Sequence, residues 1–265
     1  MALRSVTLDA LIIDDEASFA PLPLYVALKA ALARSEHRFL IPGRGGTMSW
    51  DRALFLNLTY WSPEAAADVL CDEHIPADVV AHAAWHHVVS HEVGLAAGAG
   101  PPTAEGLFFA ESIASAFDLF LVGRLLREAP DTDFITTQVP VMREVAEEAG
   151  LSDRAFEALL AGVCAAPARA FEELRVLLLD VTIALWGCRA PTDAEAVLER
   201  YAAHRFGPLL HHYQLSNWIL YARAYARGAP ERTRAVLRLD EALRAAPDAL
   251  AWLERHWLGG AGLPE

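Results

Sequence analysis

The sequence has almost no lysine: Lys29 is the only one among its 22 basic residues. Acidic residues number 35, so the formal net charge is −13, and no run of basic side chains offsets it. A chain without a basic patch is a poor match for the phosphates of nucleic acid or for an anionic membrane surface. We therefore expect neither as a partner. The strong preference for Arg over Lys, with abundant alanine, suggests a bacterial coding sequence of high GC content.

Cysteines are also few. Cys71, Cys164 and Cys188 are far apart and odd in number, so they predict neither a disulfide framework nor a Cys-based zinc motif. The sequence lacks an uninterrupted apolar run of about 18 residues, the length that a membrane-spanning helix needs. It also lacks a basic segment followed by an apolar one at its start, as in a signal peptide. Together these absences predict a soluble, cytoplasmic protein.

Apolar residues, in contrast, are abundant, and their pattern predicts helices. They make up 54% of the 265 residues, enough for a large core. The fold class expected is mainly α, a multi-helical globular protein with a small β element near the N-terminus, where Ser5–Ile13 and Arg52–Trp61 are strand candidates. Helices are expected at about 23–35, 62–72, 77–95, 103–128, 139–149, 152–164, 167–188, 193–205, 208–227, 231–244 and 247–257.

The domain organisation follows from one short break. Residues 129–133 (Ala-Pro-Asp-Thr-Asp) interrupt the helical pattern and are the best boundary candidate. They divide the chain into an N-terminal region, 1–130, and a helical C-terminal region, 131–265. One continuous domain is the alternative.

Four of the ten histidines lie close together in the helix expected at 77–95. They are His82, His86, His87 and His91. His87 and His91 are spaced i,i+4 and therefore lie one above the other on one helix face, whereas we expect His82 and His86 to face elsewhere. Apolar residues surround this helix on all sides, so it should be central in the fold and its histidines buried with partners.

A glutamate at a fixed distance gives the pair His87 and His91 a third partner. Glu111 follows His91 after nineteen residues and lies two turns into the next expected helix. The Gly/Pro-rich connection at 94–102 would let that helix fold back antiparallel. Two imidazoles and one carboxylate are a ligand set for a zinc ion with an open coordination position.

The spacing His87-Val-Val-Ser-His91, nineteen residues, then Glu111 resembles the gluzincin metallopeptidases, especially those similar to thermolysin. Their pattern is His-Glu-x-x-His followed by a glutamate one helix later. The segment Glu-Ser-Ile-Ala-Ser-Ala-Phe that begins at Glu111 is also similar to that family's glutamate helix. The resemblance covers roughly residues 80–122. It implies zinc as the cofactor, His87, His91 and Glu111 as its ligands, and metallohydrolase-like chemistry at most.

The departure from the family pattern falls on the chemistry. The glutamate that should follow the first histidine and activate a zinc-bound water is Val88 here, which cannot accept a proton. Glu92 stands one turn further along and is an alternative catalytic candidate. We therefore expect a metallopeptidase-like pseudoenzyme without peptidase activity, and the pattern leaves open whether the protein is an enzyme at all.

Further site candidates come from the same comparison. Asp118 lies seven residues after Glu111, on the same helix face, and is expected to orient a ligand imidazole or to pair with Arg124. Ser115 occupies the place where the family often has an orienting carboxylate. His211 and His212 lie in the C-terminal helical region, where the family has a histidine that stabilises the transition state.

Two other interpretations of the histidine helix remain. The same two-His-one-carboxylate set would suit a non-haem iron enzyme, since iron(II) favours such a facial triad with open positions. Alternatively, the polar residues form a buried network without metal, and the helices are a scaffold that binds a protein partner or a second copy of the chain. A metal analysis of the purified protein separates the last interpretation from the other two.

Overall fold

The computed structural model describes residues 3–42, 61–62, 67–70, 72–93, 103–226 and 233–259. The fold is mainly α-helical, which confirms the predicted class, and within these ranges all strands lie before residue 77. The predicted strand Arg52–Trp61, except for its last residue, and the Gly/Pro-rich connection 94–102 lie outside the described residues.

The strands form two small sheets. The first has four strands in the order β1-β3-β5-β4, antiparallel except for the parallel pair β3 and β5, and the second is the parallel pair β2 and β6. The segment Ser5–Ile13 therefore contributes to two strands separated by a 3-10 turn. The bounds are β1 Leu3–Val6, β2 Ile12–Asp14, β3 Phe39–Pro42, β4 Trp61–Ser62, β5 Ala67–Val69 and β6 His74–Pro76.

The helix predicted at 62–72 is wrong, because β4 includes Ser62 and β5 spans Ala67–Val69. Ser62-Pro63 has the sequence of a helix start, but β5 pairs with β3, with Asp68 opposite Phe39. The buried carboxylate of Asp68 also lies 2.9 Å from Nε2 of His37, just before β3. These contacts with a distant segment override the local helical signal.

The remaining helices follow the sequence pattern closely. Side-chain caps mark five of their starts. The residues that each accept a hydrogen bond from a backbone N–H in the first turn are Thr103, Thr132, Ser152, Thr233 and Asp248. The bounds are α1 Glu16–Phe19, α2 Pro23–Arg34, α4 Ala77–Glu92, α5 Ala104–Glu128, α6 Asp133–Glu148, α7 Asp153–Ala165, α8 Pro167–Trp186, α9 Pro191–Tyr201, α10 Leu215–Tyr225, α11 Arg234–Ala245, α12 Ala249–Leu253 and the π-helical turn Glu254–Leu258.

Two predicted helices differ in extent. The cap at Thr132 starts α6 six residues earlier than expected and leaves Pro140 inside the helix. The helix expected at 208–227 is divided into a 3-10 segment, η2 (Gly207–Tyr213), and α10. Gln214 separates them with a left-handed backbone, φ 49°, which no continuous α-helix accommodates.

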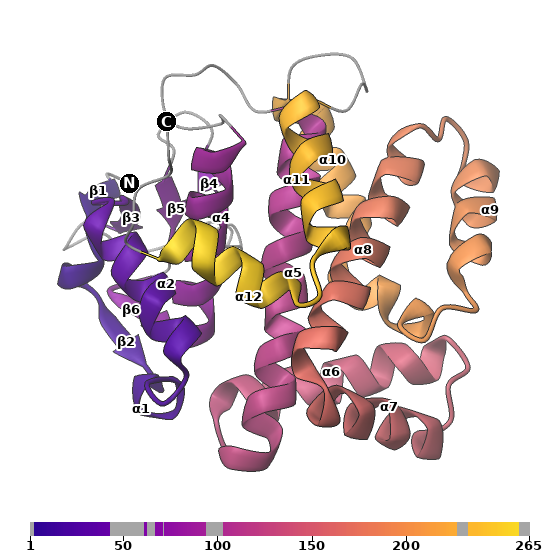
Figure 1. Cartoon of the computed structure of the whole chain (residues 1–265), viewed down its shortest axis with the longest axis horizontal. Coiled ribbons are helices and arrows are strands. Elements are labelled where there is room, and N and C mark those ends of the chain that lie inside the picture. The colour runs from indigo at the N-terminus through magenta and orange to yellow at the C-terminus, as the bar shows by residue number, and fades with distance from the viewer. Residues whose placement is uncertain are drawn as a thin grey trace.

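Helix α5 is central in the fold. It packs against α4 on one side and against α8 on the other, so the two predicted regions of the chain meet on it (Figure 1). By length and composition α5 is apolar enough to cross a membrane, but 83% of its most apolar window is buried inside the protein. That burial is typical of the core helix of a soluble protein, and Glu111 and Asp118 are half-buried on it.

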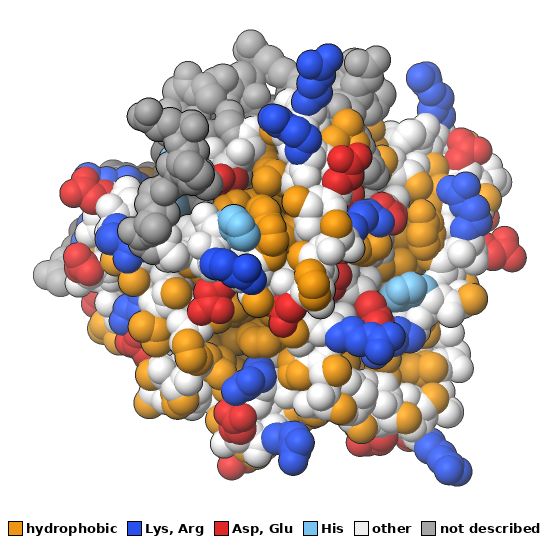
Figure 2. Space-filling view, viewed as in Figure 1, with side chains coloured by type: hydrophobic (Ala, Val, Ile, Leu, Met, Phe, Trp, Pro, Cys, Tyr) orange, Lys and Arg blue, Asp and Glu red, His pale blue; other side chains and the backbone are white. Residues whose placement is uncertain are grey.

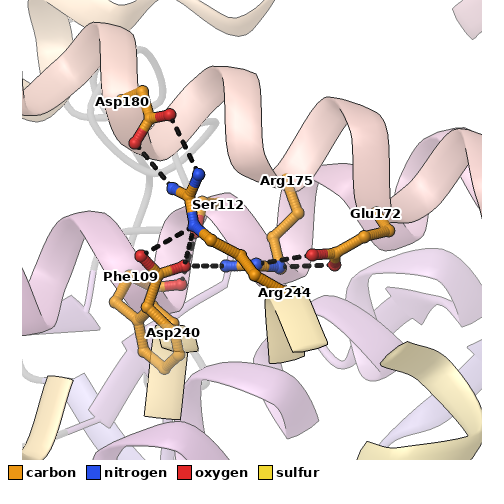
Figure 3. Close-up of polar contacts among 7 residues, drawn as sticks. All are labelled: Phe109, Ser112, Glu172, Arg175, Asp180, Asp240 and Arg244. Atoms are coloured by element: carbon orange, nitrogen blue, oxygen red, sulfur yellow. Dashed lines mark hydrogen bonds and ion pairs between the residues drawn. The ribbon is translucent and has the colours of Figure 1, made fainter. Parts of the chain in front are cut away.

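An ion-pair network attaches α11 to α8 (Figure 3). The fully buried Arg175 on α8 donates to Glu172 and to Asp240, and Asp240 also accepts from Arg244. Arg244 in turn forms two hydrogen bonds with Asp180 on α8. At the surface, by contrast, acidic and basic side chains are interspersed, and the face seen in Figure 2 has no basic patch.

Candidate metal centre

Two adjacent helices form the candidate site. On α4, His82 and His86 lie one turn apart, with ring centroids 4.7 Å from each other. Both point to α5, where Oε2 of Glu111 lies 3.8 Å from Nε2 of His82 and 3.5 Å from Nε2 of His86. Asp118, two turns further along α5, meets His82. His86, the later histidine of α4, meets Glu111, the earlier acid of α5, whereas His82 reaches Asp118. The two helices therefore run antiparallel.

The donor atoms of His82, His86 and Glu111 all lie within 4.8 Å of one another. Donor atoms that share one tetrahedral zinc ion are about 3.3 Å apart, so small side-chain rotations would bring these three onto an ion. Nitrogen and oxygen donors in this ratio suit zinc, and they suit iron(II) as well.

An unsatisfied atom supports the fit. Nε2 of His86 is buried and, apart from its ion pair with Glu111 at 3.5 Å, makes no hydrogen bond with the described residues. Buried polar atoms in folded proteins nearly always have a partner. A metal ion held between His86 and Glu111 would supply one, since an imidazole nitrogen binds a metal with the lone pair that otherwise accepts a hydrogen bond.

The electrostatics of the site couple its carboxylates and imidazoles. Burial by itself lowers the pKa of His82, but the carboxylates of Asp118 and Glu111 outweigh burial and raise that pKa well above its usual value. Burial raises the pKa of Glu111, but the imidazoles of His86 and His82 hold it far below its usual range. The pocket thus favours a positive charge between the two helices, which a proton or a metal cation can provide.

Asp118 is placed to orient His82. Its Oδ2 lies 3.1 Å from Nδ1 of His82, which leaves Nε2 of the same ring toward Glu111. A carboxylate on the far nitrogen fixes the tautomer and orientation of a metal-binding imidazole. The arginine that the sequence offered as an alternative partner, Arg124, pairs with Glu128 instead.

The structure does not bring the predicted ligands His87 and His91 to Glu111. His87 turns to the N-terminal sheet, where its ring packs against His37 at 5.8 Å between centroids. Burial, with smaller effects from His37 and His91, lowers the pKa of His87 to about 4. The side chain of His91 is 69% exposed, and its Nδ1 lies 3.3 Å from Glu92. Of the three predicted ligands, only Glu111 belongs to the group observed.

The reason lies in the helix geometry. His82-x-x-x-His86 has the same i,i+4 spacing as His87-x-x-x-His91, and the two pairs point about 140° apart around α4. The nineteen-residue spacing to Glu111 favoured the second pair. The sequence also contains a pattern that favours His82 and His86. Glu111 and Asp118 are two acids on one face of α5, and they can meet two histidines on one face of α4.

The other predicted residues lie at different places. Ser115 is buried on α5 between Glu111 and Asp118. Glu92 contacts His91 at the end of α4 and does not line the cavity described next. His211 is exposed and borders a separate groove beside α9 and α10. His212, its neighbour, faces the candidate site.

A cavity of about 590 Å³ opens beside the three donor atoms. Its wall is formed by α4, α5, α6, η2 and α10 and includes His82, His86 and Glu111. Two further buried atoms without a hydrogen bond belong to residues of this wall, Oδ1 of Asp118 and Nδ1 of His212. Burial lowers the pKa of His212, so its imidazole is neutral near pH 7. Sequence reasoning placed His212 by region alone; its position opposite α5 results from the break at Gln214.

Fold and site together define a mainly α-helical protein with a group of residues that could bind a metal ion. A scan against models of protein families, a search of curated proteins and a search of solved structures each found no match. The resemblance to gluzincins therefore depends on the short sequence pattern around the histidines and Glu111 alone.

Proposed function

We propose that this protein binds a divalent metal ion, zinc in the first place, through His82, His86 and Glu111. The observation that carries the proposal is the convergence of these three donor atoms on the wall of a large cavity. With three protein ligands, zinc keeps a coordination position for water or a ligand, and the cavity gives access to it. When bound, the ion would act as a Lewis acid toward that ligand.

The residues around the site favour metal binding over peptidase activity. Among the described residues, Glu111 and Asp118 are the carboxylates that line the cavity, and both contact histidines. A metallopeptidase similar to thermolysin has its general base directly after the first histidine ligand. With His82 as that ligand the residue is Ala83, which, like Val88 after His87, cannot accept a proton. The proposed site thus resembles that of a metallopeptidase in its ligands but lacks the carboxylate that would act as general base. Nδ1 of His212, also on the cavity wall, makes no hydrogen bond with the described residues.

We also propose a cytoplasmic location. Cys164 and Cys188 are free thiols in the structure, as expected in a reducing compartment.

Metal analysis of single variants tests the proposal. The wild-type protein, saturated with zinc and then desalted, should retain about one ion per chain. His82→Ala, His86→Ala and Glu111→Gln should lose most of it. His87→Ala and His91→Ala are matched controls from the same helix and should retain it. Absence of zinc from the wild type, or equal losses in the controls, would overturn the proposal.

The same donor set supports a second candidate, a non-haem iron protein, because two histidines and one carboxylate are the ligands of a facial triad. Elemental analysis of protein expressed without added metal, together with anaerobic titration by iron(II) and by zinc, distinguishes the two. Iron as the predominant metal, with zinc displaced by iron(II), would favour the iron protein.

A further inference from the structure

The cavity beside the candidate metal centre has two kinds of wall. One part is apolar and comes mainly from α5 and α6, with Phe108, Leu119, Val122, Phe134 and Met142. The polar part contains the metal-binding group, the unpaired atoms of Asp118 and His212, and uncharged side chains such as Thr137, Gln138 and Asn217. An apolar pocket with a few convergent polar groups is the usual form of a small-molecule site, and about 590 Å³ is within the usual range of volumes.

The charges of the wall limit what the cavity can hold. None of the described lining residues is Lys or Arg, and the acids are Glu111 and Asp118. A divalent ion on neutral histidines would balance these two carboxylates. An anionic ligand would then add an uncompensated negative charge to a partly buried site, in a chain of net charge −13. A neutral ligand would not.

We propose that the cavity binds an uncharged, largely apolar small molecule, one polar end of which meets the metal ion while its apolar part lies along α5 and α6. This inference rests on the proposed metal site for the position of the polar end. The volume and the apolar wall do not depend on the metal. The two parts of the inference can therefore be tested separately.

Calorimetric titration of the zinc-loaded protein with three probes tests the ligand class. N-methylimidazole and N-hexylimidazole are neutral metal ligands, used above their own pKa, that differ only in the apolar tail. Octanoate has a similar tail and a negative charge. N-hexylimidazole should bind at least tenfold more tightly than N-methylimidazole and at least tenfold more tightly than octanoate. Equal affinity of the two imidazoles, or tighter binding of octanoate, would overturn the inference.

A charge placed at the cavity mouth supplies a second test. Val141 on α6 lines the cavity and is 48% exposed, so Val141→Arg should fold normally. The new guanidinium should strengthen octanoate binding several-fold and leave N-methylimidazole little changed. Val26→Arg is the matched control, since Val26 is 50% exposed on α2 and lines neither cavity nor groove. An unchanged octanoate affinity in Val141→Arg would place the probe outside this cavity.

The metal-free protein separates the two proposals. If the metal proposal fails and the cavity assignment holds, N-hexylimidazole still binds metal-free protein more tightly than N-methylimidazole does. A second outcome is that zinc binds at His82, His86 and Glu111 but the hexyl tail does not raise affinity for either the zinc-loaded or the metal-free protein. In that case the metal site stands and the inference about the ligand is wrong.

Discussion

Asp118 contacts His82, one of the proposed metal ligands. It holds Nδ1 of His82 at 3.1 Å, and Nε2 of the same ring faces Glu111. We predict that Asp118→Asn weakens zinc affinity by about 10- to 100-fold, as loss of an orienting carboxylate commonly does. Competition for zinc with a chromophoric chelator measures this affinity. The melting temperature of the metal-free variant serves as a check, because a general loss of folding would lower it sharply.

Asp78, at the start of α4, predicts how the stability of the fold depends on pH. Burial, followed by the nearby charge of Asp118, raises the pKa of Asp78 from 3.8 to about 6. Well below pH 3.8 the carboxyl is protonated in both the folded and the unfolded chain and costs nothing. Between about pH 4 and 6 the unfolded chain ionises before the folded one, so stability falls across this range and stays at the lower level above it.

Asp78→Asn should therefore stabilise the protein near neutral pH, by on the order of 1–3 kcal/mol, and have little effect at about pH 4. Urea unfolding at both pH values measures the difference. Asp131→Asn, in the exposed turn before α6, is the control and should change little at either pH. A stabilisation independent of pH would contradict the assignment of the effect to ionisation.

At the scale of elements, Gly123 permits the close approach of α5 to α7 and α8. A Cβ at this position would lie 2.9 Å from the carbonyl oxygen of Val163 and 3.1 Å from Cβ of Pro167. Gly123→Ala should therefore destabilise the protein by about 1–3 kcal/mol, since packed backbone cannot easily move.

The control for Gly123→Ala is Gly162→Ala on α7. Its Cβ would meet only Nη1 of Arg205, at 3.8 Å, and alanine is favoured over glycine in a helix by about 1 kcal/mol. This variant should be slightly more stable than the wild type in the same urea titration. If both alanines have the same effect, the contact of Gly123 with α7 and α8 does not limit the packing.

The ion-pair network between α8 and α11 gives a second prediction at this scale. Arg175 is fully buried, and its Nη1 lies 3.0 Å from Oδ1 of Asp240. Asp240→Ala would leave that charge with Glu172 as its remaining carboxylate partner and should cost about 3–5 kcal/mol. Glu128→Ala removes the exposed pair with Arg124 and should cost less than about 1 kcal/mol. Similar losses in the two variants would show that burial of the network is unimportant.

At the scale of the whole molecule, metal binding should stabilise the fold. Zinc at a free concentration about 100 times its dissociation constant adds about 2.7 kcal/mol, which corresponds to several degrees in melting temperature for a chain of this size. Excess EDTA should reverse the shift in the wild type. Glu111→Gln should show neither the increase nor its reversal. A zinc-dependent shift that persists in this variant would place the ion elsewhere.

Much of the fold could be predicted from local sequence. Thr103 and Ser152 cap helices at the expected residues, and the apolar surroundings of the histidine helix indicated that α4 is buried. The helix starts and the burial of α4 depend on residues within one or two helical turns of each other. Glu111 was found in another way, through its spacing of nineteen residues after His91, although the histidines that it meets are His82 and His86.

The sequence by itself determined the helical class, most helix starts and the presence of one carboxylate and two histidine pairs near the core. The tertiary structure decided that β5 is a strand paired with β3, and that His82 and His86, not His87 and His91, meet Glu111. The physical reason is the same in both cases. Periodicity relates side chains within one helix, whereas the face that meets a neighbour depends on how α4 packs between α2 and α5.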